Sequence, residues 1–154
     1  MPMRLGTPMP SLDGATEWIH STGVPTLEKG KVTLIHFWAV SCHICHETME
    51  EVLKIKDRYA KDGLQTVAIH MPRYEEDANK ARVLEDIATY GMNQPIGLDH
   101  RMEISQRFEN EYVPAFFIFG EDGTLKFRAA GDKGFQKVEP KIREALGLPA
   151  DNPA

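Results

Sequence analysis

The sequence of 154 residues is poor in cysteine, with two in all, and it has no long hydrophobic run. No stretch approaches the roughly 18 consecutive apolar residues of a membrane-spanning helix. Residues 1–18 contain no basic segment followed by an apolar run, the pattern of a signal peptide. We therefore expect a cytoplasmic protein that has no membrane partner.

The basic residues form no block or stripe, since 18 Lys and Arg are outnumbered by 23 Asp and Glu and the net charge is −5. Nucleic acid is therefore not an expected partner, because phosphate binding requires clustered cations. The sequence also lacks internal repeats, low-complexity segments and an interdomain linker. We assign residues 1–147 to a single domain and residues 148–154 to a loose C-terminal tail, and we expect a monomer.

Both cysteines lie in one short segment, HFWAVSCHICHET at residues 36–48. Cys42 and Cys45 have the spacing of a C-x-x-C redox pair, and with His46 they also form the attachment sequence of a c-type haem. The same three residues could begin a zinc site. Because the cytosol keeps thiols reduced, a purely structural disulfide is not expected there. The pair is expected to react or to bind metal.

The cysteines follow a segment that reads as a buried strand. Residues 31–40, KVTLIHFWAV, are rich in β-branched and aromatic residues and nearly free of charge. From Cys45 onward, apolar residues recur at the spacing of a helix. The unpaired N–H groups at a helix N-terminus stabilise a thiolate and lower its pKa from about 8.5 toward neutrality. We therefore expect Cys42 to carry the accessible, attacking sulfur and Cys45 to be the shielded, resolving thiol.

The remaining segments alternate between strands and helices. Apolar runs predict strands at residues 64–70, 95–98, 115–119 and 125–129, and helical spacing predicts helices at residues 76–90, 100–108 and 135–146. Gly91 is expected to end the first of these helices, and an Asp-Gly turn is expected to join the last two strands in a hairpin. This order predicts an α/β fold with a central mixed sheet and helices on both faces. Small c-type haem proteins are mostly helical, which argues against haem attachment.

At this point the chain resembles the thioredoxin-fold superfamily. The segment FWAVSCHIC resembles its strand-to-helix junction, and EYVPAFFIFGEDGTL resembles its Val-Pro pair followed by a strand and a hairpin. A helix and a strand between His70 and Tyr112, with the phrase YGMNQPIGLD, resemble the insertion of the TlpA/ResA-like group. The phrases AIHMPR and FENEYVPA resemble segments of the small cytosolic YkuV-type thiol–disulfide oxidoreductases of bacilli. The resemblance covers residues 4–147.

The resemblance implies a thiol–disulfide oxidoreductase, most simply a reductase of protein disulfides that needs no bound cofactor. It makes Cys42 the nucleophile and Cys45 the resolving cysteine. It makes Val113 and Pro114 the cis-proline pair that faces the disulfide and binds substrate, and it places Trp38 beside the site. The implied partners are a disulfide-containing protein substrate and an electron-donating reductase.

Three positions depart from relatives of this fold. Ser41 stands where thioredoxin has a tryptophan just before the first cysteine, and His36 stands where thioredoxin has a buried acid. Both departures argue against a general thioredoxin role. Ala39 stands where the peroxidase relatives have a threonine, so a peroxiredoxin is not expected.

The histidines near the cysteines leave alternatives open. His36 could accept a proton from the second cysteine, although we favour a core histidine with a backbone partner. His46 lies on the helical face of Cys42, where it could stabilise the thiolate or simply be solvated. His43 could donate a hydrogen bond to sulfur. For His70, at the end of a strand, we expect a role in packing a loop.

The competing function is a metal-binding module, such as a metallochaperone, that uses Cys42, Cys45 and His46 without turnover. Zinc requires four ligands, or three and a water. The sequence contains no second cysteine pair, and Cys45 is expected to point into the core. We therefore expect no metal site.

Overall fold

A computed structural model describes residues 2–149 of the chain. Its centre is a six-stranded mixed sheet with the strand order β1-β4-β3-β2-β5-β6. The strands are β1 (Glu17–Ile19), β2 (Thr33–Trp38), β3 (Gln65–His70), β4 (Ile96–Leu98), β5 (Ala115–Phe119) and β6 (Leu125–Ala130). The helices are α1 (His43–Ala60), the 3₁₀ helix η1 (Glu75–Ala78), α2 (Lys80–Tyr90), α3 (Glu103–Arg107), α4 (Gly131–Phe135) and α5 (Val138–Ala145).

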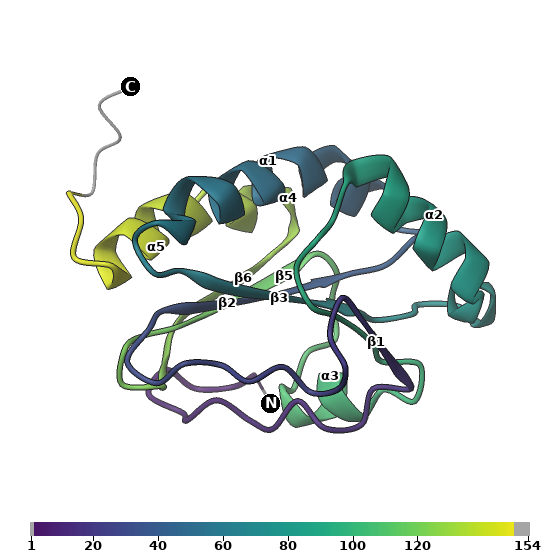
Figure 1. Cartoon of the computed structure of the whole chain (residues 1–154), viewed down its shortest axis with the longest axis horizontal. Coiled ribbons are helices and arrows are strands. Elements are labelled where there is room, and N and C mark those ends of the chain that lie inside the picture. Colours follow the sequence, from purple (N-terminus) through teal and green to yellow (C-terminus); the bar gives the residue numbers. More distant parts are fainter. Residues whose placement is uncertain (1, 150–154) are drawn as a thin grey trace.

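Helices cover both faces of this sheet, as predicted. Helices α1, α2, α4 and α5 lie on one face, whereas α3 and the N-terminal segment lie on the other (Figure 1). The central strand β2 pairs in parallel with β3 and antiparallel with β5. The segment between His70 and Tyr112 supplies α2 and β4, where an inserted helix and strand were expected. The predicted mixed α/β architecture is therefore confirmed.

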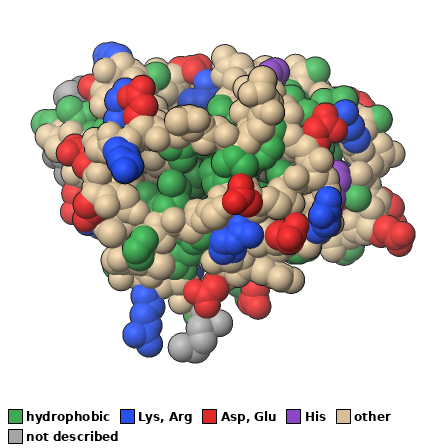
Figure 2. Space-filling model, turned by 60° about the horizontal axis from the view of Figure 1, so that its bottom comes forward, with side chains coloured by type: hydrophobic (Ala, Val, Ile, Leu, Met, Phe, Trp, Pro, Cys, Tyr) green, Lys and Arg blue, Asp and Glu red, His purple; other side chains and the backbone are tan. Residues whose placement is uncertain are grey.

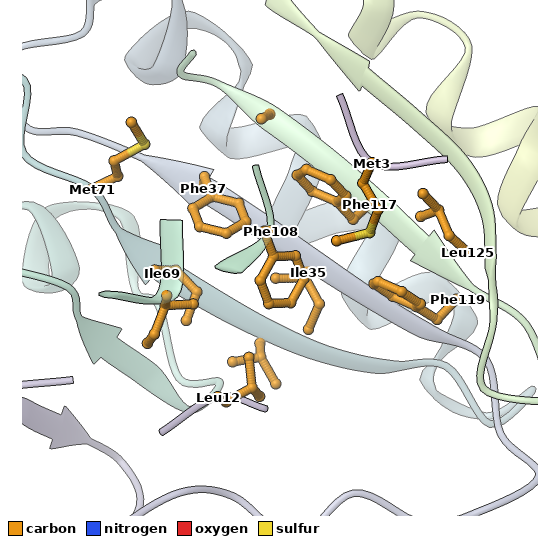
Figure 3. Packing of buried hydrophobic residues seen from close by; sticks show 13 residues of the cluster. Met3, Leu12, Ile35, Phe37, Ile69, Met71, Phe108, Phe117, Phe119 and Leu125 are labelled. Carbon is orange, nitrogen blue, oxygen red and sulfur yellow. The ribbon is translucent and has the colours of Figure 1, made fainter. Parts of the chain in front are cut away.

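The alternation of side chains along β2 builds a core on each face of the sheet. Ile35 and Phe37 point to the face of α3, where they pack with Phe108 and other buried side chains of one hydrophobic cluster (Figure 3). Leu34 and Trp38 point to the opposite face, which α1 covers. Because successive side chains of a strand point to opposite faces, a strand that is apolar at nearly every position is buried on both sides. The end of β2 is therefore held firmly.

The side of the molecule that carries the N-terminal segment has no large area of one charge. Hydrophobic side chains gather in a hollow near the middle of this face, and acidic and basic side chains alternate around it (Figure 2). Within residues 2–149, no helix is both long and apolar enough to cross a membrane.

One predicted helix is divided in the structure, and another begins later than expected. The helix expected at residues 76–90 is broken by Asn79, whose side chain accepts a hydrogen bond from the N–H of Ala81 and so starts α2 anew. Gly91 ends α2 in the left-handed conformation, as predicted, with a φ of 68°. The helix expected at residues 135–146 is present as α5, which begins only at Val138, and the short helix α4 before it was not predicted. The position of Pro140 explains the later start, because proline is tolerated only in the first turn of a helix.

The helix expected at residues 100–108 is shorter, since α3 spans only Glu103–Arg107. The carboxylate of Asp99 accepts hydrogen bonds from the N–H groups of Ile104 and Ser105 and so fixes where it begins. The edge strand β1 was not predicted. Of the tail expected at residues 148–154, Leu148 and Pro149 are hydrogen-bonded to Arg143, and residues 150–154 lie outside the described part of the chain.

Replacing Phe108 with alanine is expected to lower the free energy of unfolding by about 3–5 kcal/mol. The ring is fully buried and meets Phe37, Phe117 and Phe119 edge to face at centroid distances of 5.5, 5.4 and 6.0 Å. Urea denaturation measures the loss. Val24→Ala, at a side chain that is 45% exposed, is the control, and a loss for Phe108→Ala no larger than that of the control would contradict the packing described.

Candidate active site

The two cysteines lie where β2 gives way to α1. Cys42 is the N-cap of α1, with a φ of −92° and a ψ of 109°, and its sulfur accepts a hydrogen bond from the N–H of Cys45 at 3.0 Å. The two sulfurs form a disulfide, and the Cα atoms are 5.2 Å apart. The predicted junction of strand and helix is confirmed. A helix N-terminus directs its unpaired N–H groups, and its partial positive charge, toward the sulfur of Cys42.

The prediction that Cys42 is accessible is wrong for this disulfide-bonded form. Cys42 is 3% exposed and Cys45 is fully buried. Both belong to the hydrophobic cluster of the α1 face, which includes Val40, with Val113 packed against it. The expected order holds, with the first cysteine the less buried of the two. Both residues are nevertheless buried in this form.

Trp38 and His46 share a partner that the sequence did not suggest. The Nε2 atom of His46 lies 2.8 Å from the Oδ2 atom of Asp86, and the indole N–H of Trp38 donates to the same oxygen at 3.4 Å. The ring of His46 also stacks on Tyr90. Asp86 therefore ties the first turn of α1 to α2. Trp38 is fully buried and packs beside the cysteines in the same cluster, as the resemblance implied.

His36 lies in the core, stacked parallel to Phe116 with ring centroids 5.1 Å apart. Burial lowers its pKa to about 3, because desolvation disfavours the charged imidazolium. A core position was predicted, but the predicted backbone partner is wrong. Neither ring nitrogen has a hydrogen-bond partner within residues 2–149. A proton acceptor for Cys45 would need a pKa near neutrality, and the pKa of His36 is far below that.

The other two histidines of interest occupy different environments. His43 is exposed and its Nε2 atom lies 2.7 Å from the carboxylate of Glu47, so the structure places it against that carboxylate rather than a sulfur. His70 is buried, and its Nε2 atom accepts a hydrogen bond from the N–H of Val40 at 3.2 Å. Burial, and secondarily the nearby His100, lower the pKa of His70 to about 3. The predicted role of His70 in packing a loop is thus confirmed, and the loop is the one that contains Val40.

The Val113–Pro114 peptide bond is cis. Pro114 is buried, and Val113 packs against both hydrophobic clusters that border the disulfide end of the sheet. Within the described part of the chain, neither the N–H nor the C=O of Val113 makes a hydrogen bond. Tyr112, just before it, is 66% exposed. A backbone donor and acceptor are thus free at this position.

The alternative of a metal-binding module is not supported. Among residues 2–149, no group of three His, Cys, Asp or Glu side chains is arranged to hold a metal ion. The three candidate ligands have other partners, because Cys42 and Cys45 are bonded to each other and His46 faces Asp86.

Comparison with known proteins gives one consistent result. The Redoxin family matches residues 5–146. The thiol-disulfide oxidoreductase YkuV of Bacillus subtilis (strain 168) is 40% identical over 147 residues, which are 94% of this chain and 97% of that protein. The thioredoxin-like protein SkfH of the same strain is 32% identical over 110 residues, which are 71% of this chain and 75% of that protein. The solution structure of a thioredoxin-like protein in the oxidized form has a TM-score of 0.84 and 38% identity, covering 94% of this chain and 98% of that chain. The fold is therefore thioredoxin-like, as the resemblance implied.

Replacing His36 with phenylalanine is expected to reduce the loss of stability on acidification. The unfolded chain protonates this histidine near 6.5, whereas the folded protein does so only near 3. Between these values the unfolded state binds the additional proton, so the free energy of unfolding falls as the pH falls, by about 1.4 kcal/mol per pH unit for this one group. Phenylalanine removes that contribution and keeps an aromatic ring against Phe116.

Urea denaturation at a series of pH values in this window measures the difference in slope between His36→Phe and the wild type. The control is His20→Asn, at an exposed residue whose positive φ of 62° asparagine tolerates. Equal slopes for His36→Phe and the wild type would contradict the neutral, buried state of His36.

Proposed function

The chain belongs to the Redoxin family and is a thiol–disulfide oxidoreductase, and on that premise we propose that it acts as a reductase of protein disulfides. The observation that carries the proposal is the Cys42–Cys45 disulfide at the N-terminus of α1, with the N–H of Cys45 on the sulfur of Cys42. A thiolate formed at Cys42 would receive the same hydrogen bond and the partial positive charge of the helix. Both stabilise the anion, which is the attacking form in thiol–disulfide exchange.

The proposed cycle begins with both cysteines reduced. The Cys42 thiolate attacks one sulfur of the substrate disulfide, which forms a mixed disulfide and releases the other substrate sulfur as a thiolate that takes a proton from water. Cys45 then attacks the sulfur of Cys42, which breaks the mixed disulfide, and the proton of Cys45 passes to the departing second substrate thiolate. The substrate has gained two electrons and the Cys42–Cys45 disulfide has formed. An electron-donating reductase returns two electrons to the pair, and no bound cofactor takes part.

The substrate segment is proposed to lie along the backbone of Val113. Its free N–H and C=O can pair with an extended chain in the manner of strand addition. Pro114 fixes the chain that follows, which enters β5 directly. Exposed Tyr112 offers apolar area beside this position. The substrate is accordingly a protein with an accessible disulfide in an extended segment.

The side chains around the cysteines are proposed to support the exchange without reacting. Trp38 and His46 act through Asp86, which fixes the first turn of α1 against α2. His43 is exposed one residue after Cys42, at the rim that a substrate approaches. His36 contributes by packing on Phe116, because burial keeps it neutral at physiological pH.

We further propose that the protein works in the cytoplasm as a monomer whose single domain comprises residues 1–147. One continuous six-stranded sheet runs through the described residues, which supports the single domain. In a reducing compartment the pair returns to the dithiol after each turnover, which suits a reductase better than an oxidant.

Replacing Cys45 with serine is expected to trap a mixed disulfide at Cys42, because no second thiol remains to resolve it. Incubation of the reduced variant with oxidised glutathione should add one glutathione, located on Cys42 by peptide mass mapping. Cys42→Ser should form no such adduct at a comparable rate, since Cys45 is fully buried. Rapid modification of Cys45 in Cys42→Ser, with Cys42 inert in Cys45→Ser, would reverse the assigned roles.

The same Cys45→Ser variant tests the role of Val113. In a trapped mixed disulfide with a single-cysteine peptide of about seven residues, the N–H of Val113 is expected to exchange with deuterium at least about tenfold more slowly than in the free variant. The mixed disulfide with 2-mercaptoethanol is the control, because this thiol has no peptide group to pair with the backbone of Val113. Equal exchange in both adducts would contradict strand addition at Val113.

A further inference from the structure

A polar cluster beside the cysteines takes no part in the proposed cycle. It consists of Ser41, Arg73 and Asp77, which come from the loop before α1, the loop after β3 and η1. The hydroxyl of Ser41 donates to Oδ2 of Asp77 at 2.7 Å. The guanidinium of Arg73 donates to the carbonyl of Ser41 at 2.6 Å and to its hydroxyl at 3.2 Å. Both the side chain and the backbone of the residue before Cys42 are therefore held.

Asp77 is a buried carboxylate, 1% exposed. Burial by itself raises its pKa and is the largest single effect, but the hydrogen bonds from Ser41 and from the N–H groups of Arg73 and Tyr74 together hold the pKa below its usual range. Its Oδ1 atom has no partner within the described residues. A buried charge is costly unless it is hydrogen-bonded. The fold thus carries an ionised group at the point where it holds Ser41.

Arg73 is an exposed residue whose guanidinium has partners on two sides. Its planar guanidinium lies over the ring of Tyr74 at 5.3 Å, and two of its nitrogens donate to Ser41. A guanidinium fork fixes both the position and the direction of the group that it binds, which a lysine ammonium does not. Its positive charge is thereby placed one peptide unit from Cys42.

The loop between β2 and α1 is held at further points from the same side. The N–H of Val40 donates to His70, the last residue of β3, and the N–H of Cys42 closes a turn onto the carbonyl of Ala39 at 3.1 Å. Residues 70–77 therefore hold two consecutive residues, Val40 and Ser41, directly before the nucleophile. This arrangement leaves the peptide that leads into α1 little freedom.

We propose that Arg73 and Asp77 are positioning residues for Cys42, which act by fixing Ser41 so that the N-terminus of α1 stays directed at the sulfur. The proposal rests on the proposed function, in which Cys42 is the nucleophile. Stabilisation by a helix N-terminus falls off within the first turn, so it depends on where the N-cap residue is held. The charge of Arg73 acts in the same direction, because a nearby cation favours the thiolate.

The test is the pH dependence of alkylation of reduced protein by iodoacetamide, with the modified cysteine identified by peptide mass. In Arg73→Met and in Ser41→Ala, the rise in the Cys42 alkylation rate should move to higher pH. At pH values below this rise the rate should fall by about tenfold, as it does when the pKa of the thiol increases by about one unit. Arg73→Lys, which keeps the charge without the fork, should lie between Arg73→Met and the wild type.

Arg101→Met is the matched control. The side chain of Arg101 is 70% exposed, and its guanidinium makes only a long contact, 4.0 Å, with the carboxylate of Glu103. This variant should behave as the wild type. Circular dichroism shows whether Arg73→Met and Ser41→Ala are folded. If both are folded and their alkylation rates depend on pH as in the wild type, the positioning role is overturned. If Cys45 rather than Cys42 reacts in the reduced wild type, the proposed function itself fails, and the positioning role fails with it.

Discussion

The hydrogen bond from the N–H of Cys45 to the sulfur of Cys42 is the contact on which the rest of the site depends. It exists because a fully buried strand ends at Trp38 and a helix begins at His43, which leaves four residues to place Cys42 at the helix N-terminus. The strand cannot shift to relieve a poorly placed junction, since it is paired on both edges and packed on both faces. Packing along β2, far from the cysteines, therefore fixes the position of Cys42 at the start of α1.

The ends of the neighbouring segments complete this support. At the end of β3 and just beyond it, His70, Arg73 and Asp77 hold the loop before Cys42. On the other side of the site, Val113 presents free backbone groups at the start of β5. A site that is carried by rigid elements and supported by a surrounding layer of hydrogen bonds holds its geometry through a reaction. The sulfur of Cys42 and the free backbone of Val113 thus lie next to the ends of adjoining strands, β2 and β5, of one sheet.

Local patterns predicted much of this architecture. The uniform apolar run of β2, the helical spacing of α1 and the Asp-Gly hairpin turn each depend on neighbouring residues alone, and each is present in the structure. The break at Asn79 and the late start of α5 were missed because helical spacing alone does not mark a cap or a first-turn proline. The strand β1 has only three residues, too few for a pattern to appear, and it forms through its pairing with β4.

The site was predicted less completely than the fold. The cysteines and the Val113–Pro114 pair were identifiable from their motifs, but the partners that surround them were not. Asp77 and Asp86 lie 36 and 40 residues from Ser41 and His46 in the sequence, and only the fold brings each pair together. The burial of Cys42 and the missing partner of His36 likewise result from tertiary packing, which a single sequence does not show.

The most direct test of the account is the redox equilibrium of the Cys42/Cys45 pair in the wild-type protein against a graded thiol–disulfide buffer, read by thiol alkylation and mass. The account predicts a single two-electron transition, with a midpoint between about −230 and −290 mV for a reductase in a reducing compartment. A protein that forms no intramolecular disulfide at any potential would contradict it.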